Sequence, residues 1–267
     1  MTAVPVALTI AGSDPSGGAG IQADLCTFAA FGVHGASVLT ALTAQDTRGV
    51  RAIAEVAPAF VGQQLDAVLD DLPVRAAKTG MLHRAPVIDA VVDRLRARPV
   101  PHLVVDPVMV ATSGDPLLEP AGIAALRERL LPLATLVTPN LREAEVLTGR
   151  AVTTVREMRE AARALVARGA RAALVKGGHL AGDAVDVLHD GRGFRELRAP
   201  RREGRRLHGT GCVLSAAITA GLALGNDLDD AVAEAKRYVT LAIETAPEIG
   251  HAHLPGRGSG RMPIVPR

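Results

Sequence analysis

The sequence predicts an α/β fold with a mainly parallel sheet covered by helices on both faces. Short apolar runs rich in β-branched residues, typical of buried strands, alternate with segments of helical periodicity through most of the 267 residues. Parallel strands need crossover helices, and those helices cover both faces of the sheet. Repeats, low-complexity linkers and shifts in composition are not evident. We therefore expect one domain over residues 1–250 and an irregular tail over residues 251–267.

Composition excludes several classes of function. The net charge is +2, from 30 basic and 28 acidic residues, which is too balanced for a surface that binds polyanions. One Tyr, four Phe and no Trp leave little for nucleic-acid bases to stack on. The N-terminus lacks a charged signal segment, and no apolar run is long enough to span a bilayer. Cys26 and Cys212 lack metal-ligand spacing. We expect a cytoplasmic protein with no nucleic-acid and no membrane partner.

The first strand, expected over Val4–Ala11, leads through a glycine-rich loop into a helix over Ile21–Phe31. This layout is typical of a nucleotide-binding turn, and Gly18-Ala19-Gly20 loosely fits the dinucleotide pattern. We discount that match because no strand end carries the ribose-binding acid expected about 20 residues further on. Asp24, one turn into the helix, could point at a ligand of the loop or lie on a solvated face.

Gln45 follows the second expected strand, over Val33–Thr43. Its amide could offer a donor and an acceptor to a heterocycle, or it could be an ordinary turn amide. The third strand, over Ala76–Met81, runs into a loop, where Met81 could pack on a planar ligand or simply fill space. Helical periodicity covers Phe60–Leu72 and Val87–Arg96.

Polar side chains end the next three expected strands. The strands over His102–Met109, Ala134–Thr138 and Ala172–Lys176 lead to Asp106, Asn140 and Lys176, respectively. In a parallel sheet, carboxyl ends of strands face the ligand crevice. Asn140 and Glu143 have the spacing of a helix cap, and the same groups could reach a Mg²⁺ ion through waters. Lys176, followed by two glycines, could clamp a phosphate.

The remaining elements are read in the same way. We expect a polar flap over Val110–Leu117, helices over Ala121–Leu131, Val155–Ala167 and Asp229–Thr245, a hairpin of Asp183–His189 with Gly193–Arg198 around Asp190-Gly191, and a basic loop over Arg201–Arg206.

Gly209, Thr210, Gly211 and Cys212 form what we call the anion turn. They precede the apolar run Val213–Leu224, which predicts a buried helix. Glycines let the chain bend sharply, and the helix start offers unpaired N–H groups and a partial positive charge, which together suit a phosphate. A thiol at a helix N-terminus is expected to have a lowered pKa. The alternative is an ordinary turn with Cys212 as a small buried hydrophobe.

Seven segments together resemble the bacterial hydroxymethylpyrimidine/phosphomethylpyrimidine kinases of thiamine biosynthesis. They are Ala7–Asp24, Ala41–Gln45, Lys78–Met81, Ser113–Leu118, Thr138–Glu143, Lys176–His179 and His208–Cys212. The resemblance implies a ribokinase-like three-layer α/β/α sandwich, usually a homodimer. It also implies ATP and Mg²⁺, and a pyrimidine substrate, 4-amino-5-hydroxymethyl-2-methylpyrimidine, which is phosphorylated to its monophosphate and then to its pyrophosphate.

The resemblance also implies roles for single residues. Gln45 would hold the amino group and ring nitrogen of the pyrimidine, and Gly12, Asp24, Met81 and Val108 would line the same pocket. Asp106, Asn140 and Glu143 would serve the metal and its waters, Lys176 would contact the ATP phosphates, and Gly209, Thr210 and Gly211 would form the anion hole. Cys212 stands where related sugar kinases have an aspartate base. An alcohol must lose a proton as it attacks phosphorus, whereas a phosphate monoester is already ionised, so a base helps the first transfer more.

Three alternatives stay open at this stage. A pyridoxal or pyridoxine kinase of the same superfamily would differ in the ring it accepts. A dinucleotide-dependent oxidoreductase would rest on Gly18-Ala19-Gly20 but lacks the ribose acid. A non-catalytic metabolite sensor of kinase-like fold would not need the anion turn together with Lys176 and Asp106.

Overall fold

The computed structural model describes residues 4–111, 113–178, 180, 183–200 and 208–255. Nine strands of this part form one sheet in the order β3-β2-β1-β4-β5-β6-β7-β8-β9. Pairing is parallel from β2 to β7, and β3, β8 and β9 run antiparallel to their neighbours. The strands are β1 (Val6–Ser13), β2 (His34–Gln45), β3 (Val50–Glu55), β4 (Val74–Thr79), β5 (His102–Val105), β6 (Leu136–Val137), β7 (Ala173–Val175), β8 (Ala184–His189) and β9 (Phe194–Ala199).

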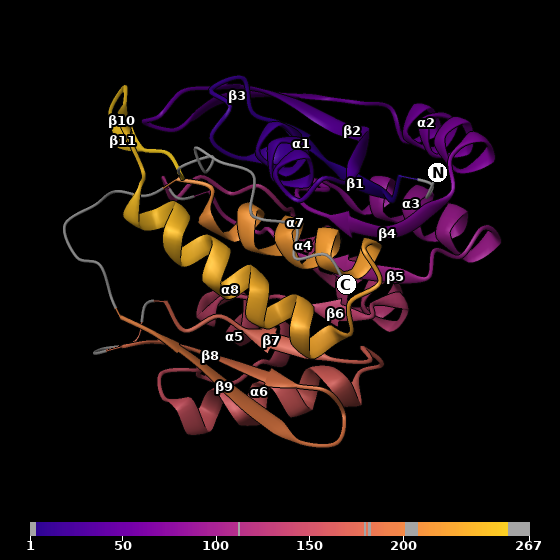
Figure 1. The fold of residues 1–267 in the computed structure, drawn as a ribbon. Helices are drawn as coiled ribbons and strands as arrows, with labels where there is room; N and C mark the ends of the chain where they lie inside the picture. Colours follow the sequence, from indigo (N-terminus) through magenta and orange to yellow (C-terminus); the bar gives the residue numbers. More distant parts are fainter. Residues whose placement is uncertain (1–3, 112, 179, 181–182, 201–207, 256–267) are drawn as a thin grey trace.

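Helices cover both faces of this sheet, as the alternating sequence pattern predicts (Figure 1). They are α1 (Gly20–Ala30), α2 (Pro58–Asp71), α3 (Ala85–Ala97), α4 (Pro120–Ala125), α5 (Leu141–Thr148), α6 (Val155–Ala167), α7 (Thr210–Ala223) and α8 (Leu228–Glu244). A π turn (Leu126–Leu130) and a 3₁₀ turn (Leu131–Leu133) continue α4.

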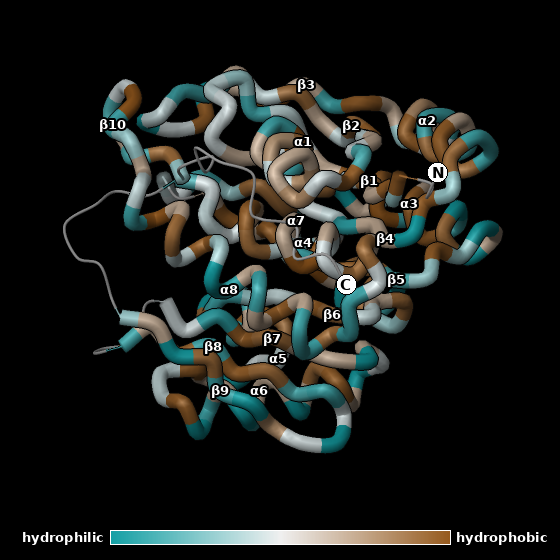
Figure 2. The backbone as a smooth tube through the Cα atoms, in the orientation of Figure 1, coloured by the Kyte–Doolittle hydropathy of each residue, from teal (hydrophilic) through white to brown (hydrophobic). Residues whose placement is uncertain are grey.

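Two aliphatic cores fill the spaces between these three layers. One core joins the sheet to α2, α3, α5 and α6, and the other joins it to α1, α7 and α8. In β1, Val6, Leu8 and Ile10 point into the first core and Ala7 into the second, as the two-residue period of a strand requires. Brown segments accordingly gather at the sheet and on the inner sides of the helices (Figure 2). The three-layer α/β/α architecture expected from the sequence is confirmed.

Helix α7 is the most enclosed helix of the second core. Every residue from Val213 to Ala223 is buried, and the helix packs on β1, β4 and β5. Its small side chains allow a close approach to the sheet, because Ala and Gly leave the backbone uncovered. The helix begins at Thr210, three residues before the apolar run, so the anion turn includes its first turn.

Several predicted bounds differ from the structure. Strand β3 was not expected, since its residues are half-exposed or exposed and give no alternating apolar signal. Strand β2 extends to Gln45 itself. The hairpin of β8 and β9 is confirmed, with Gly191 at φ +88.

The prediction of an irregular tail from His251 is wrong at its start. A two-stranded sheet pairs β10 (Glu248–Ile249) with β11 (Ala252–His253), and Leu254 is buried. Apolar side chains at Ala252 and Leu254 find cover there, which a Gly- and Pro-rich composition does not reveal. Residues 256–267 and the basic loop over Arg201–Arg206 lie outside the described residues.

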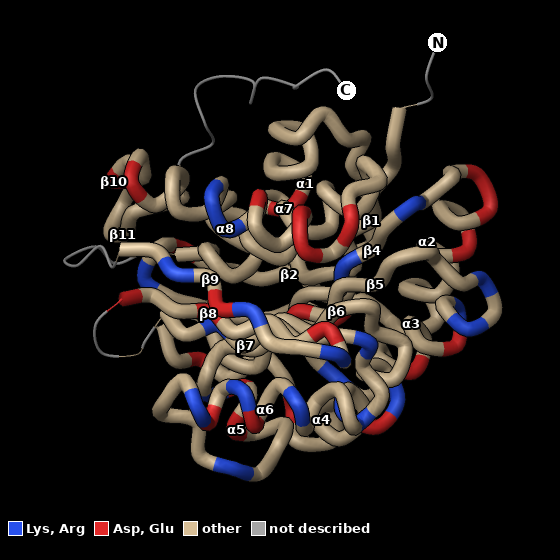
Figure 3. The backbone as a smooth tube through the Cα atoms, turned by 60° about the horizontal axis from the view of Figure 1, so that its bottom comes forward, with Lys and Arg blue, Asp and Glu red and all other residues tan. Residues whose placement is uncertain are grey.

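Charges of both signs are interspersed over the surface helices α3 and α6 in Figure 3, whereas the charged residues of α2 are all acidic. Among the helices that the structure describes, none has the length and apolar character needed to span a bilayer.

Candidate active site

The order of the strands locates the site. Strand β1 has β2 on one side and β4 on the other. The strands before β4 therefore extend the sheet to one side of β1, and those from β4 onward extend it to the other side. Ligands of open α/β sheets bind at the carboxyl ends of strands beside such a change of side. Gly12 near the end of β1 and Met81 just after β4 meet at this point, with 3.1 Å between an ideal Cβ at Gly12 and the Met81 sulfur.

A small third apolar cluster lies at this edge, apart from the two main cores. It consists of buried Ala41, Met81 and Leu117, with Val108 packed against them. The structure thus brings together three of the residues expected to line the substrate pocket, namely Gly12, Met81 and Val108. An apolar patch of this size suits the flat face of a ring.

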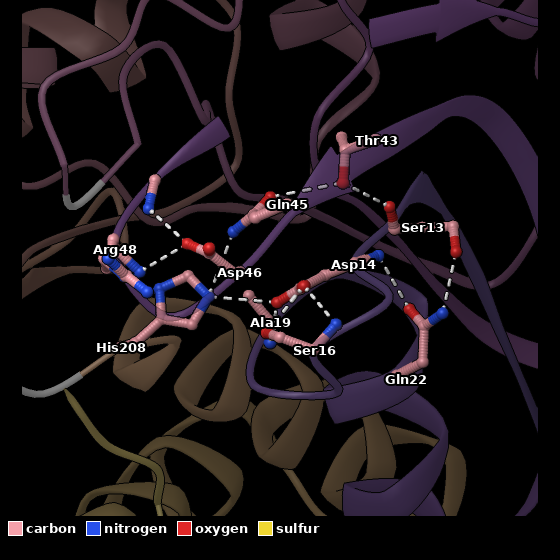
Figure 4. A network of polar contacts seen from close by, with 11 residues as sticks. Ser13, Asp14, Ser16, Ala19, Gln22, Thr43, Gln45, Asp46, Arg48 and His208 are labelled. Atoms are coloured by element: carbon pink, nitrogen blue, oxygen red, sulfur yellow. Dashed lines mark hydrogen bonds and ion pairs between the residues drawn. The ribbon is translucent and has the colours of Figure 1, made fainter. Parts of the chain in front are cut away.

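Asp14 organises the loop that follows β1, residues 14–20, which we call the glycine loop. Its Oδ1 accepts hydrogen bonds from the amide and hydroxyl of Ser16, and its Oδ2 accepts from the amide of Ala19 at 2.9 Å. Burial opposes ionisation of Asp14, but hydrogen bonds from His208 and Ser16 outweigh it and hold the pKa of this carboxyl below its usual value. The loop is therefore built around a buried carboxylate (Figure 4).

The anion turn packs directly on the glycine loop. Gly209 has φ +87, and a Cβ there would overlap the carbonyl oxygen of Gly18, so only glycine fits. The first intrahelical bond of α7 runs from Val213 N to Gly209 O, and no side chain caps the helix. The amides of Thr210, Gly211 and Cys212 therefore precede the helical ladder, as an anion site requires.

Lys176 and Asp106 lie beside this turn. Lys176 Nζ is 3.0 Å from Asp106 Oδ1 and 3.3 Å from an ideal Cβ at Gly211. The other oxygen of Asp106 accepts from Ser215 of α7 at 3.0 Å. Burial disfavours the charge of Lys176, but the carboxylates of Asp106 and Glu143 outweigh it and raise the pKa of Lys176. The structure thus places a charged ammonium next to the amides of residues 210–212, which have no hydrogen-bond partner among the described residues.

Asn140 and Glu143 form the expected capping box at the start of α5. The Asn140 side chain accepts from Glu143 N at 3.0 Å, and Glu143 Oε2 accepts from Asn140 N at 2.8 Å. Burial raises the pKa of Glu143 to about 7, with Lys176 opposing this effect and Asp106 adding to it. The Asp106 carboxylate is therefore close enough to Glu143 to disfavour ionisation of Glu143.

Asp24 is neither solvated nor directed at the loop. Its side chain is fully buried, where it pairs with Lys78 Nζ at 2.9 Å and accepts from the Thr9 hydroxyl at 2.6 Å. Burial alone would lower the pKa of Lys78, but the Asp24 carboxylate outweighs it and raises that pKa. The pair lies between β4 and α1, beneath the anion turn.

The expectation of a lowered pKa for Cys212 is wrong. Burial raises the pKa of this thiol to about 11; Lys78 and a hydrogen bond from Gly20 oppose the rise, and Asp24 and Asp106 add to it. Desolvation by the packed helix start thus exceeds the help that a helix N-terminus gives a thiolate.

Gln45 faces a cleft and meets the residue that precedes the anion turn. The cleft is lined by Gln45, Asp46, Thr47, Arg48, Gly49, Ser113, His208 and Ala252. His208 Nε2 lies 3.1 Å from Gln45 Nε2 and 3.0 Å from Asp14 Oδ2 (Figure 4). The expected flap borders this cleft, where the amide of Val50 in β3 donates to Asp115 at 3.1 Å.

The donor set fits a magnesium ion carried with a nucleotide. Asp106, Asn140 and Glu143 offer oxygen atoms, the ligands that Mg²⁺ prefers, and the ion usually keeps several waters and binds phosphates. Within the described ranges, no group of three or more His, Cys, Asp or Glu could hold a metal by itself. A cation shared between phosphates and a few carboxylates is consistent with both facts.

Comparison with known proteins decides the family. Residues 14–257 match the sequence profile of the family described as phosphomethylpyrimidine kinase. The chain belongs to the phosphomethylpyrimidine kinase family. A hydroxymethylpyrimidine/phosphomethylpyrimidine kinase of Rhizobium meliloti is 56% identical over 266 residues, which cover 99% of this chain and 97% of that protein. A thiamine biosynthesis bifunctional protein of Geobacter sulfurreducens is 53% identical, and this chain spans 51% of its length.

Solved structures agree with this assignment and show the ribokinase-like fold. A phosphomethylpyrimidine kinase of Clostridium difficile has a TM-score of 0.81 and 44% identity, covering 90% of this chain and 99% of that one. A pyridoxal kinase of Bacillus subtilis, as an ADP complex, has a TM-score of 0.89 and 37% identity, covering 96% and 98%. These relatives are kinases, so the comparisons lend no support to an oxidoreductase.

Sequence reasoning gave no role to Asp14, Lys78, His208 or Ser215. Lys78 carried a signal, since a lysine inside an apolar strand must find a buried partner. His208 lay within the quoted motif, but its contacts depend on loops that meet only in the folded chain.

Proposed function

We propose that this member of the phosphomethylpyrimidine kinase family transfers the γ-phosphoryl group of ATP twice. The acceptors are 4-amino-5-hydroxymethyl-2-methylpyrimidine and then its monophosphate, and the product is the pyrophosphate used to build thiamine. The observation that carries this proposal is the position of the anion turn. It abuts Lys176 through Gly211 on one side and reaches Gln45 through His208 on the other.

The nucleotide phosphates occupy the first of these two sides. The amides of residues 210–212 and the Lys176 ammonium neutralise charge on the transferred group, in an arrangement fixed before the reaction. Asp106, Asn140 and Glu143 would hold a magnesium ion through its waters. When bound, that ion neutralises phosphate charge and orients the nucleotide.

The pyrimidine occupies the second side. Gln45 holds the amino group and ring nitrogen, and Gly12, Met81 and Val108 cover the ring. Asp24 supports this pocket from beneath through Lys78 and has no exposed surface for the ligand. Cys212 lies beside the acceptor hydroxyl and takes its proton during the first transfer. Because the free thiol has a pKa of about 11, it must ionise first, which Lys78 favours.

Turnover of two rings tests the proposal. An ATPase-coupled assay is run with the pyrimidine and with pyridoxal, each with ATP and Mg²⁺. We expect kcat/KM to favour the pyrimidine by at least about tenfold, because a site built for an amino group leaves its polar groups unpaired with another ring. Absence of pyrimidine-dependent turnover contradicts the proposal.

A pyridoxal kinase is the second candidate, favoured by one observation. The TM-score to the Bacillus subtilis pyridoxal kinase exceeds that to the Clostridium difficile phosphomethylpyrimidine kinase, although the sequence identity is lower. A kcat/KM that favours pyridoxal in the same assay supports this candidate.

We also propose that the enzyme is a homodimer, as the resemblance to the family implies, and that it is cytoplasmic, as expected from its composition. Size-exclusion chromatography with light-scattering detection measures the mass of the protein in solution. A mass equal to one chain contradicts the dimer.

A further inference from the structure

His208 packs between the glycine loop and the hairpin of β10 and β11. A Cβ at Gly18 would lie 2.6 Å from the imidazole Cδ2, so the absence of a side chain at Gly18 makes room for the ring. The backbone amide of His208 donates to His253 O at 3.1 Å. One residue later, Gly209 packs on Gly18 and begins the anion turn. These contacts place the ring beside both Asp14 and Gln45.

The same nitrogen of His208 contacts two groups that make opposite demands. Nε2 is 3.0 Å from Asp14 Oδ2, and a carboxylate can only accept, so this contact needs a proton on Nε2. Nε2 is also 3.1 Å from Gln45 Nε2, and an amide NH₂ group can only donate, so that contact needs a bare Nε2. A single ring nitrogen cannot meet both demands.

Asp14 decides between these demands. Its carboxylate is buried and ionised, with a lowered pKa, and already accepts from Ser16 and Ala19. An unprotonated Nε2 would set a lone pair against this charge. The proton therefore lies on Nε2, and the Gln45 atom beside it must be the amide oxygen. The two ends of an amide have nearly the same shape, so partners determine which end lies where.

The contacts of Gln45 with Thr43 agree with this orientation of the amide group. The Gln45 atom near Thr43 is then the NH₂ group, at 3.3 Å from the Thr43 hydroxyl, which accepts from it and donates to Ser13 O at 2.9 Å. Each donor now meets an acceptor along the chain of contacts drawn in Figure 4. One N–H and one oxygen lone pair of Gln45 remain for a ligand.

We propose that His208, protonated on Nε2 and anchored by Asp14, fixes the sense of the Gln45 amide and thereby selects a ring that carries an amino group beside a ring nitrogen. His208 is a positioning residue, and this inference rests on the proposed function. The amide oxygen then accepts from the amino group, and the amide N–H donates to the ring nitrogen. Gly209 directly follows His208 in the chain. The residue that orients the pyrimidine is therefore next to the turn that binds the phosphates of ATP.

The tautomer is tested without any substrate. Two-bond ¹⁵N–¹H correlation spectra of the protein distinguish a ring protonated on Nε2 from one protonated on Nδ1, and loss of signals in His208→Gln assigns the ring. We expect a spectrum in which Nε2 carries a proton, whether or not Nδ1 also carries one. The neutral Nδ1–H pattern overturns the inference.

Selectivity is tested with His208→Phe, which keeps a ring against Gly18 but has no N–H. The two substrates are the pyrimidine and its analogue without the 4-amino group. We expect kcat/KM for the pyrimidine to fall about 10- to 100-fold, since a polar group of the site loses its partner. The analogue should lose less than about threefold, and KM for ATP should hold within the same range.

Two further variants serve as a rescue and as a control for that experiment. His208→Gln returns a donor near the position of Nε2 and should restore most of the selectivity. His34→Phe makes the same exchange at an exposed residue at the opposite end of β2 and should change nothing. Equal losses on both substrates, or no loss, overturn the inference. If His208→Phe does not fold, the tautomer measurement decides. A wild-type enzyme inactive on the pyrimidine contradicts the proposed function instead, and the tautomer still tests the amide sense.

Discussion

Cys212 and Lys78 show how single residues depend on charges that the sequence does not place. The thiol follows two glycines at a helix start, a pattern that predicts a reactive thiolate, yet burial raises its pKa to about 11. Lys78 lies inside a buried strand, where its charge is stabilised by Asp24, which pairs with it at 2.9 Å. The pKa of Cys212 responds to the same buried charges, Lys78 and Asp24, that pair with each other beneath the anion turn. Their energetics follow from the fold rather than from the local sequence.

Cys212→Ala should affect the two phosphoryl transfers differently. We expect the first transfer to lose about 100-fold or more, because an alcohol needs a base, and the second to change less than about threefold. The wild-type first transfer should also accelerate with pH from 7 to 9, since thiolate increases on approach to a pKa of about 11. Separate assays of each step across pH measure both effects. Equal losses, or a first step independent of pH, contradict the base role.

Lys78→Met should destabilise the protein strongly. The variant leaves Asp24 buried without its cation, which costs about 3–5 kcal/mol when one partner of a buried pair is removed. The double variant Asp24→Asn with Lys78→Met should recover a large part of this, because no lone charge remains. Urea denaturation gives the free energies of unfolding. A Lys78→Met variant as stable as the wild type would show that the pair is unimportant to the fold.

At the scale of elements, α7 connects the fold to the chemistry. Its apolar sequence predicts a buried helix, and the structure confirms that every residue from Val213 to Ala223 is buried. Its start could be placed only to within a turn, because Thr210 to Cys212 are not apolar. Strand β3 was not predicted, because both its faces are partly exposed and its sequence shows no alternation of apolar and polar residues. By contrast, the cap of Asn140 and Glu143 is local and was predicted correctly.

Two glycines flanking α7 offer a matched test of the anion turn. Gly209 and Gly225 both have positive φ, at +87 and +94, but a Cβ at Gly225 would meet nothing within 4 Å. Both alanine variants should pay the backbone strain of about 1–2 kcal/mol. Only Gly209→Ala should displace the glycine loop, and we expect it to lose kinase activity by about 100-fold or more.

Thermal melts and initial rates of the two variants measure these effects together. Gly225→Ala should keep at least about half of the wild-type rate, since strain alone does not reach the site. Equal rates for the two variants would contradict the role given to the turn.

At the scale of the whole molecule, the sheet and the two cores explain why distant residues form one site. The alternation of strands and helices predicts the layers, and the carboxyl ends of β1, β4 and β5 then lie along one edge. Asp106, Asn140 and Lys176 could be assigned to that edge from sequence, because each follows a buried strand. The contacts of His208 with Asp14 and Gln45 could not, because three segments far apart in the sequence must first be brought together.

We expect the described elements to unfold as one unit. A continuous sheet from β3 to β9, with α7 packed on its centre, leaves no boundary at which a part could separate. Scanning calorimetry should give a single transition, with equal calorimetric and van't Hoff enthalpies per cooperative unit. Two resolved transitions would contradict the single domain expected over residues 1–250.

The decisive experiment is a structure with a non-hydrolysable ATP analogue and the pyrimidine bound together. We expect γ-phosphate oxygens within hydrogen-bond distance of the amides of residues 210–212 and of Lys176 Nζ. The hydroxymethyl oxygen should then lie beside Cys212, with the amino group of the ring on Gln45. A γ-phosphate bound on the glycine loop instead, with the anion turn empty, would contradict it.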